Sequence, residues 1–420
     1  MRTLEQWLAL QESVHPQAID MGLERVTRVA RALGVERLSC PVVTVAGTNG
    51  KGATCAHLEA LLRATGLSTG LFTSPHLLRY NERIRINGRE VADAALLQVF
   101  EQIEQARATT TLTFFEYNTL AALLLFRAQS VQVAVLEVGL GGRLDATNLI
   151  DADVAIVCSI GFDHRDWLGE TLEQIGAEKA GIFRSGRPAL LSTAQMPRSV
   201  WAAIEQTGAR AVVAERDYHW QRDPAAGSWS YQGLQLRLSE LPPPALSGSI
   251  QYRNAATALA AIECLSLGVT REQAAAGLQQ VHLPGRFQIV PGEIEWILDI
   301  AHNEPAAQVF ADQVREHRSD RGGRVLAVTG ILADKDAPAI ARVLQPLIEQ
   351  WILCSLPGPR GMPAAQLAAR VQLPPSQVRL AGSVSEGCEL AAKLVRPGDC
   401  VLVFGSVYTV GPALQWLGIY

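Results

Sequence analysis

A loop of small residues around a single lysine is the segment of this chain best suited to chemistry. Residues 45–54 read VAGTNGKGAT, and Lys51 stands among three glycines directly after the apolar, β-branched segment 41–47. Glycines let backbone N–H groups approach an anion closely, and the start of a following helix adds positive potential. The loop therefore predicts a phosphate site in which Lys51 reaches the outer phosphates. The alternative is a tight strand-to-helix turn with a surface lysine.

The loop departs from the usual phosphate-binding pattern after the lysine. That pattern ends Gly-Lys-Ser/Thr, and its hydroxyl holds Mg²⁺. Here Gly52 follows Lys51, and Ala53 follows Gly52. Either Thr54 substitutes for the missing hydroxyl, or the metal is held by residues outside the loop.

Other polar residues follow later apolar segments. Glu137 ends VAVLEV and precedes a glycine-rich stretch, while Asp163 and His164 follow DVAIVCSI. A carboxylate at a strand tip suits a metal ion, and imidazole suits Mn²⁺ better than Mg²⁺. Alone, such an acid is as well explained by a helix cap or an ion pair, and such a histidine by an ordinary loop. Lys179, in AEKAGIF, reads by itself as an ordinary helical lysine.

Two further motifs lie near a change in the chain's pattern. LPGR ends at Arg286, and DIAHN spans residues 299–303. Arginine suits the clamping of phosphate or carboxylate groups. Because both motifs lie at the expected junction of two domains, they predict a site between those domains.

The scaffold expected to position these residues is of the α/β class. Short β-branched segments alternate with helical ones, which indicates parallel sheets covered on both faces. Ligands of such sheets bind beyond the carboxyl ends of the strands. We expect a P-loop-type parallel-sheet domain at residues 1–288, with a small antiparallel insert near residues 217–238, and a smaller Rossmann-like domain at residues 289–420.

Composition excludes several classes of protein. The chain has 420 residues, 48 % of them hydrophobic and 19 % charged, as in ordinary globular proteins. A net charge of −4 gives no basic field for nucleic acid. No apolar run reaches the ~20 residues that span a membrane, and the amphipathic N-terminus is a poor signal peptide. The seven cysteines are scattered, so we expect neither a zinc site nor a disulfide framework. A location in the reducing cytoplasm is therefore expected. No long apolar surface pattern requires a dimer, so a monomer is expected.

Taken together, these motifs resemble a known family. GTNGKG, TSPH, TFFEY, LEVGLGGRLDATN, EKAGIFR, LPGRF and DIAHN occur in the order found in the bifunctional dihydrofolate synthase/folylpolyglutamate synthases, which belong with the Mur-type ATP-dependent amide ligases. GTNGK alone is shared with the muramyl-peptide ligases, whereas LEVGLGGRLDATN and EKAGIFR indicate the folate branch. The resemblance covers essentially the whole chain.

The resemblance implies a role for each matching position. ATP contacts are implied at Gly47, Thr48, Asn49, Gly50, Lys51, Gly52, Ala53, Asn254, Arg286 and Asp299. Binding of Mg²⁺, or of Mn²⁺ in its place, is implied at Ser74, Glu137 and His164. Binding of dihydropteroate is implied at Asp20, Met21, Thr113, Phe115, Asp145 and Ala146. Catalytic roles are implied for Lys51, for Lys179 as a carbamate formed with CO₂, and for His302. The family also allows a monovalent cation.

The implied reaction joins L-glutamate to dihydropteroate, giving dihydrofolate, and to reduced folates, giving folylpolyglutamates. It uses ATP and passes through an acyl phosphate, with the ATP and pteroate sites in the first domain and a glutamate ligase domain second. The partners are small molecules. Enzymes limited to polyglutamylation resemble this sequence less at the pteroate positions, which favours the bifunctional form. Two alternatives stay open: a folylpolyglutamate synthase alone, or an ATP-binding switch that performs no ligation.

Overall fold

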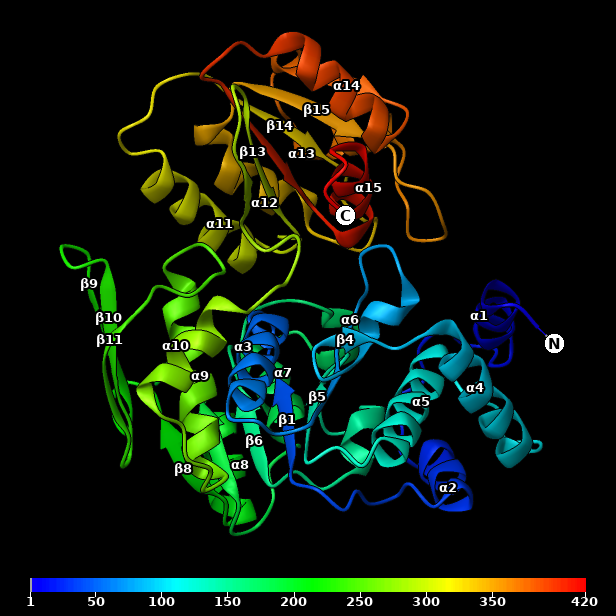
Figure 1. Ribbon diagram of the computed structural model, residues 1–420. Coiled ribbons are helices and arrows are strands. Elements are labelled where there is room, and N and C mark those ends of the chain that lie inside the picture. The colour runs from blue at the N-terminus through cyan, green and yellow to red at the C-terminus, as the bar shows by residue number, and fades with distance from the viewer. Residues whose placement is uncertain (1) are drawn as a thin grey trace. The chain divides into compact units, whose positions relative to one another are not determined.

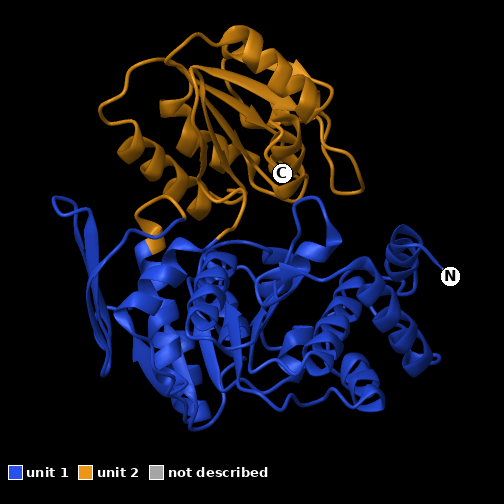
Figure 2. Ribbon diagram, viewed as in Figure 1, with its two compact units in different colours: residues 1–245, 252–281 blue, residues 246–251, 282–420 orange. Residues whose placement is uncertain are grey.

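The computed structural model describes residues 2–420, which divide into two compact units (Figures 1 and 2). Unit 1 consists of Met1–Ala245 and Tyr252–Val281, and unit 2 of Leu246–Gln251 and His282–Tyr420. The chain passes into unit 2 at His282, before the boundary that we expected after residue 288. Gln288 itself belongs to unit 2, since the strand that it begins pairs within the second sheet. The assignment of a separate function to each domain stays a prediction.

The first unit is built on a sheet of eight strands in the order β4-β3-β2-β5-β1-β6-β7-β8. Six of them, from β2 to β8 in that order, are parallel, as the sequence pattern predicts. β3 and β4 extend one edge in antiparallel orientation, which was not predicted. The strands are β1 (Val42–Ala46), β2 (Thr69–Phe72), β3 (Ile84–Ile86), β4 (Arg89–Glu90), β5 (Val133–Glu137), β6 (Val154–Val157), β7 (Pro188–Leu191) and β8 (Arg210–Val213).

Helices cover both faces of this sheet (Figure 1). Val43 and Val45 of β1 pack with α3, α9 and α10, whereas Val42 faces the opposite side with α2 and α5. Burial on both sides explains why the strands read as continuous apolar segments. The helices are α1 (Leu4–Ser13), α2 (Glu24–Leu33), α3 (Lys51–Ala64), α4 (Asp93–Arg107), α5 (Phe114–Ala128), α6 (Arg165–Leu168), α7 (Leu172–Ala180), α8 (Arg198–Thr207), α9 (Ile250–Cys264) and α10 (Arg271–Gln279), with 3-10 turns η1 (Tyr80–Arg83) and η2 (Ala146–Leu149).

The expected antiparallel insert is a three-stranded sheet rather than a single hairpin. It is formed by β9 (His219–Asp223), β10 (Ser228–Gln232) and β11 (Arg237–Leu241), with β10 in the middle. Trp229 and Tyr231 on β10 are buried and anchor the insert to the core beside α9.

The second unit is a smaller α/β sheet, which confirms the predicted class. Its strand order is β12-β13-β17-β14-β15-β16, parallel except for β12. The strands are β12 (Gln288–Val290), β13 (Glu295–Asp299), β14 (Val325–Thr329), β15 (Gln350–Cys354), β16 (Val378–Ala381) and β17 (Cys400–Phe404). The helices are α11 (Glu304–His317), α12 (Ala337–Leu344), α13 (Ala364–Val371), α14 (Val384–Leu394) and α15 (Val407–Trp416), with turns η3 (Gln345–Leu347) and η4 (Pro375–Gln377). Within residues 2–420, no helix has both the length and the apolar character needed to cross a membrane.

Candidate active site

The strand order brings the candidate loops to one edge of the first sheet. β1 lies between β5 and β6, with Val45 beside Glu137, and β2 flanks β5 on its other side. These four strands are parallel, so the loops that follow them leave the sheet on the same side. The loops carry the glycine-rich segment, Ser74, Glu137 and His164.

Two glycines set the conformation of the loop at residues 47–52. Gly47 has a φ of 149° and Gly50 a φ of 90°, values that favour glycine. A Cβ at Gly47 would lie 3.0 Å from Cys158 Cβ and 3.1 Å from the backbone nitrogen of Ser159, so a side chain does not fit there. Lys51 is the first residue of α3. The loop therefore ends in the free N–H groups of a helix start, an arrangement that binds phosphate.

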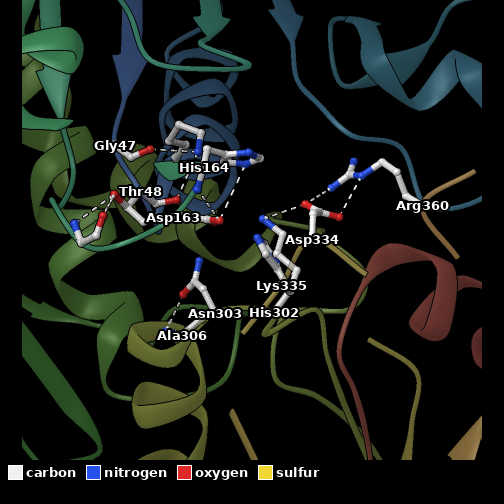
Figure 3. A network of polar contacts seen from close by, with 12 residues as sticks. Gly47, Thr48, Asp163, His164, His302, Asn303, Ala306, Asp334, Lys335 and Arg360 are labelled. Atoms are coloured by element: carbon white, nitrogen blue, oxygen red, sulfur yellow. Dashed lines mark hydrogen bonds and ion pairs between the residues drawn. The ribbon is translucent and has the colours of Figure 1, made fainter. Parts of the chain in front are cut away.

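The same loop is fastened to the segment that follows β6 (Figure 3). The Thr48 hydroxyl donates to the carbonyl of Gly161 at 3.1 Å and accepts from its N–H at 3.0 Å. The Asn49 N–H donates to the Ser159 hydroxyl at 3.0 Å, and that hydroxyl donates to the Asn49 carbonyl at 2.9 Å. Thr48 and Asn49, both predicted phosphate contacts, thus hold the shape of the loop through their own hydrogen bonds.

Two lysines meet at the carbonyl oxygen of Gly47. Lys51 Nζ donates to it at 2.9 Å and Lys179 Nζ at 3.1 Å. Burial and the positive charge of Lys51 lower the pKa of Lys179 from 10.5 to about 7, against the opposing charges of Asp163 and Asp145. Lys179 is therefore an amine that loses its proton near neutrality, which its sequence context did not indicate.

The predicted metal ligands are brought together in part. The Ser74 N–H donates to Glu137 Oε2 at 3.1 Å, and Glu137 is buried. His164 directly precedes α6 and has a left-handed φ of 51°, and its N–H donates to Asp163 Oδ1 at 2.9 Å. Asp163 and His164 lie beside Gly47 and Thr48 in Figure 3. The hydroxyl and carboxylate at Ser74 and Glu137 are oxygen ligands of the kind that Mg²⁺ and Mn²⁺ prefer, so these residues fit such an ion.

Three further residues discussed for this loop lie in the first half of α3 or α9. Of these, only Asn254 reaches the loop itself: a Cβ at Gly50 would lie 3.4 Å from Asn254 Oδ1, which places this predicted ATP contact beside Gly50. Ala53 is buried within α3. Thr54, the alternative source of a metal-binding hydroxyl, is fully buried, and its Oγ1 lies 3.4 Å from Cys158 Sγ. Thr54 therefore faces the protein core.

The predicted pteroate residues cluster around the loop that follows β5. The Phe115 ring lies against Gly139, where a Cβ would come within 2.6 Å of Phe115 Cζ, and its centroid is 5.6 Å from that of Phe72. Thr113 caps α5: its Oγ1 accepts from the N–H of Glu116, and Glu116 Oε2 accepts from the Thr113 N–H at 2.7 Å. This cap fixes the direction in which Phe115 leaves the helix.

Asp145 shapes that loop from within. Its buried carboxylate accepts from the N–H groups of Gly139 and Leu140, at 3.0 and 2.9 Å, and from the N–H and hydroxyl of Thr147. Burial raises the pKa of Asp145, although these hydrogen bonds oppose the shift. Ala146 follows as the first, buried residue of η2. The acceptor positions of Asp145 are thus used inside the protein, where they fix the loop that follows β5.

The last two pteroate positions lie between α1 and α2. Met21 Cε is 3.3 Å from where a Cβ at Gly141 would stand, so Met21 packs on the same loop. Asp20 Oδ2 accepts from Arg25 Nη1 at 2.6 Å and lies 3.0 Å from His15 Nε2. Of the six predicted pteroate residues, Phe115 and Met21 pack on the segment that follows Glu137, and Asp145 and Ala146 belong to it or follow it directly. Asp20 and Thr113 lie next to Met21 and near Phe115 in the sequence but have no contact with that segment among those described above.

The predicted residues of the second unit gather where β13 ends. Asp299 accepts from the N–H groups of Phe287 and Ala301, each at 2.8 Å. Burial raises the pKa of Asp299, while the positive charge of Arg286 opposes that shift. His302 Nδ1 lies 2.9 Å from the carbonyl oxygen of Ile300. Arg286, Asp299 and His302 thus occupy one corner of this unit.

Several polar residues were missed by sequence reasoning. In the second unit, Arg360 binds both carboxylate oxygens of Asp334, at 3.0 and 2.7 Å, and the buried Lys335 lies 3.9 Å from Asp334 (Figure 3). In the first unit, Glu116 could have been found, because Thr-x-x-Glu before an apolar helix is the signature of a capping box.

Comparisons with known proteins place the chain in a family. The model of the Mur ligase middle domain matches residues 45–217, and that of the Mur ligase glutamate ligase domain matches residues 285–407. The dihydrofolate synthase/folylpolyglutamate synthase of Escherichia coli is 42 % identical over 412 residues, which cover 98 % of this chain and 95 % of that protein.

Two solved structures are similar along their whole length. E. coli FolC in complex with DHPP and ADP has a TM-score of 0.94 at 41 % identity, covering 99 % of this chain and 98 % of that one. A bifunctional folylpolyglutamate synthase/dihydrofolate synthase with Mn, AMPPNP and L-glutamate bound has a TM-score of 0.91 at 41 % identity, covering 100 % and 98 %. The order of motifs, the two sheets and these matches agree, and the chain belongs to the dihydrofolate synthase/folylpolyglutamate synthase family of Mur-type ligases.

Proposed function

We propose that this chain uses ATP to join L-glutamate to dihydropteroate and to reduced folates. One observation carries the proposal: the end of β5 lies beside the lysine-bearing loop on one side and leads into the segment that contacts Phe115 on the other. Glu137 accepts from Ser74 beside the lysine-bearing loop, and two residues later Gly139 supports Phe115. A phosphoryl donor and a flat aromatic acid bound to these groups would meet at residues 137–139. The relatives bound to DHPP and ADP, and to Mn, AMPPNP and L-glutamate, support this reading.

The chemistry has to convert a carboxylate, a poor electrophile, into an acylating agent. A carboxylate oxygen attacks the γ-phosphorus of ATP, the bond to ADP breaks, and an acyl phosphate forms. The glutamate amine then attacks the acyl carbon through a tetrahedral intermediate, an amide bond forms, and phosphate leaves with the amine's proton lost to solvent. Lys51, at the start of α3, would offset negative charge on the transferring phosphoryl group.

A divalent ion would be held by Ser74 and Glu137, with His164 as the third predicted ligand. In residues 2–420, no three His, Cys, Asp or Glu side chains cluster closely enough to hold a metal ion. The ion would therefore take its remaining ligands from water and nucleotide phosphates, as Mg²⁺ commonly does. When bound, it would neutralise charge on the phosphates.

Lys179 is proposed to carry a carbamate. Only a neutral amine adds to CO₂, and the pKa of about 7 leaves roughly half of the Lys179 amine neutral at pH 7. Bond formation between Nζ and the carbon of CO₂, with loss of a proton, would replace a buried amine by an anion. That anion would lie close to the positive charge of Lys51, which would stabilise it.

The second unit is proposed to complete ATP binding through Arg286 and Asp299, with His302 in a catalytic role. Their common corner at the end of β13 supports a joint function. A monovalent cation, a monomeric state and a cytoplasmic location complete the proposal. The seven unpaired cysteines of the structure support a reducing compartment.

The decisive experiment measures ADP release by the pure protein with ATP, Mg²⁺ and L-glutamate, adding dihydropteroate or tetrahydrofolate in separate reactions. We expect glutamate-dependent release with both. Turnover with tetrahydrofolate alone would indicate a folylpolyglutamate synthase only. ATP binding without glutamate-dependent release in either reaction would indicate a non-catalytic switch and end the proposal.

A further inference from the structure

Two side chains rest on the loop that follows β5, each against a different glycine. Phe115 lies against Gly139, where a Cβ would be 2.6 Å from the ring, and Met21 lies against Gly141, where a Cβ would be 3.3 Å from Met21 Cε. They come from distant parts of the chain, the start of α5 and the segment before α2. Their separation across residues 139–141 therefore depends on whatever joins those two parts.

The guanidinium of Arg25 contributes to that connection. Each of the two side chains has a carboxylate as its sequence neighbour: Asp20 precedes Met21, and Glu116 follows Phe115. Arg25 Nη1 donates to Asp20 Oδ2 at 2.6 Å, and Nη2 donates to the Asp20 carbonyl at 2.7 Å. Arg25 Nη2 also lies 3.4 Å from Glu116 Oε1. The planar guanidinium fork suits such multiple contacts, which one ammonium group cannot reproduce.

Both carboxylates are themselves held in place. Asp20 Oδ2 lies 3.0 Å from His15 Nε2, while His15 Nδ1 lies 2.9 Å from Thr111 Oγ1, just before α5. Glu116 Oε2 accepts from the Thr113 N–H at 2.7 Å. Arg25 thus bridges two carboxylates that other groups also hold. Its removal is expected to loosen the segment at residues 20–21, which keeps its contact with His15, more than it disturbs α5.

The helix that carries Arg25 has other attachments. At its opposite end, Arg127 of α5 donates to the carbonyls of Leu33 and Gly34, at 2.7 and 2.9 Å. Val26 and Val29 of α2 are buried in the core cluster shared with α5. Because α2 is held in these ways, the contacts of Arg25 add little to its attachment and act mainly on the segment at residues 20–21.

We infer that Arg25 is a positioning residue for the binding of dihydropteroate. It sets the distance between Met21 and Phe115 across the Gly139–Gly141 loop, so that these side chains frame the flat ring of the substrate. The inference rests on the proposed function and assigns to that site a residue that does not touch the reacting atoms.

The test compares Arg25→Met with the unchanged protein in steady-state assays. We expect the KM for dihydropteroate to rise about tenfold with kcat changed by less than about twofold, which is the signature of weakened binding. The KM for ATP should change by less than about threefold, because Arg25 has no contact with the lysine-bearing loop among its described partners. Arg25→Lys keeps the positive charge but not the planar fork, so its KM for dihydropteroate should lie between those of the unchanged protein and Arg25→Met.

Two matched variants separate positioning from stability. Arg31→Met removes an exposed arginine of the same helix whose partner is Glu36, and should leave every constant unchanged. Arg127→Met removes the attachment at the other end of α2, and should lower the urea midpoint without raising the KM for dihydropteroate.

An unchanged KM for dihydropteroate in Arg25→Met, or an equal rise in the KM for ATP, overturns the inference. If Arg25→Met does not fold, Arg25→Lys decides: wild-type constants in that variant overturn it equally. Loss of glutamate-dependent ADP release in the unchanged protein would instead sink the proposed function, so the two failures are distinguishable.

Discussion

Lys51 and Lys179 donate to the same carbonyl oxygen, that of Gly47, at 2.9 and 3.1 Å. Two ammonium groups this close repel each other, and only one of them is buried away from water. Burial of Lys179, together with the positive charge of Lys51, lowers the pKa of Lys179 to about 7. The shared acceptor thus brings the charge of Lys51 close to a buried amine.

Carbamate loading of Lys179 is expected to rise between pH 6 and pH 8. The charged amine that dominates below a pKa of about 7 cannot add to CO₂, whereas the neutral form above it can. ¹³C NMR with labelled bicarbonate measures the loading, and the chain has only four lysines, so its signals are few. The signal should be missing in Lys179→Ala. Activity should fall in CO₂-free buffer and recover with bicarbonate; indifference to CO₂ together with no NMR signal would contradict the carbamate.

Lys51→Met is expected to move that loading curve to higher pH and to abolish ADP release. Burial would still hold the pKa of Lys179 below 10.5, but the second cause of its depression, the charge of Lys51, would be gone. The same ¹³C titration measures the shift. Lys393→Met, which removes an exposed lysine of α14, serves as the control and should leave the curve in place. An unmoved curve in Lys51→Met would show that the two charges do not interact.

Ser74→Ala is expected to raise the Mg²⁺ concentration needed for half-maximal activity by about tenfold, because the ion loses an oxygen ligand. Thr54→Val should not change it, since Thr54 is buried and its hydroxyl faces Cys158. The measurement is ADP release titrated with Mg²⁺ at fixed ATP. The reverse order of effects would place the metal at Thr54 and refute the account of the loop.

Gly139→Ala is expected to raise the KM for dihydropteroate by about tenfold while the KM for ATP stays within about twofold. The added methyl group would come within 2.6 Å of Phe115 Cζ, so the ring has to move. Gly268→Ala is a suitable control, because no heavy atom lies within 4 Å of a Cβ there. Equal KM values for dihydropteroate in both variants would show that Phe115 does not depend on Gly139.

The central strands could be predicted because burial on both faces leaves uninterrupted apolar segments, as in β1 and β5. Edge strands such as β4 and β16 were missed, since they are short and largely exposed and lack that signal. Glu137 could be expected near the loop because both follow apolar strands of one predicted parallel sheet. The depressed pKa of Lys179 could not be predicted, because it depends on burial and on a charge far away in the sequence. Arg25 gave no local sign either, as its partner Glu116 lies in another helix.

The hydrogen bonds of Thr48 and Asn49 to the segment after β6 have a thermodynamic consequence. A loop of glycines would ordinarily lose much conformational entropy when a nucleotide orders it. Here that loss is already incurred in folding, since the backbone of the loop is fixed by its neighbours. Nucleotide affinity should therefore depend on the charge and direction of the loop's donors, with little contribution from an ordering step.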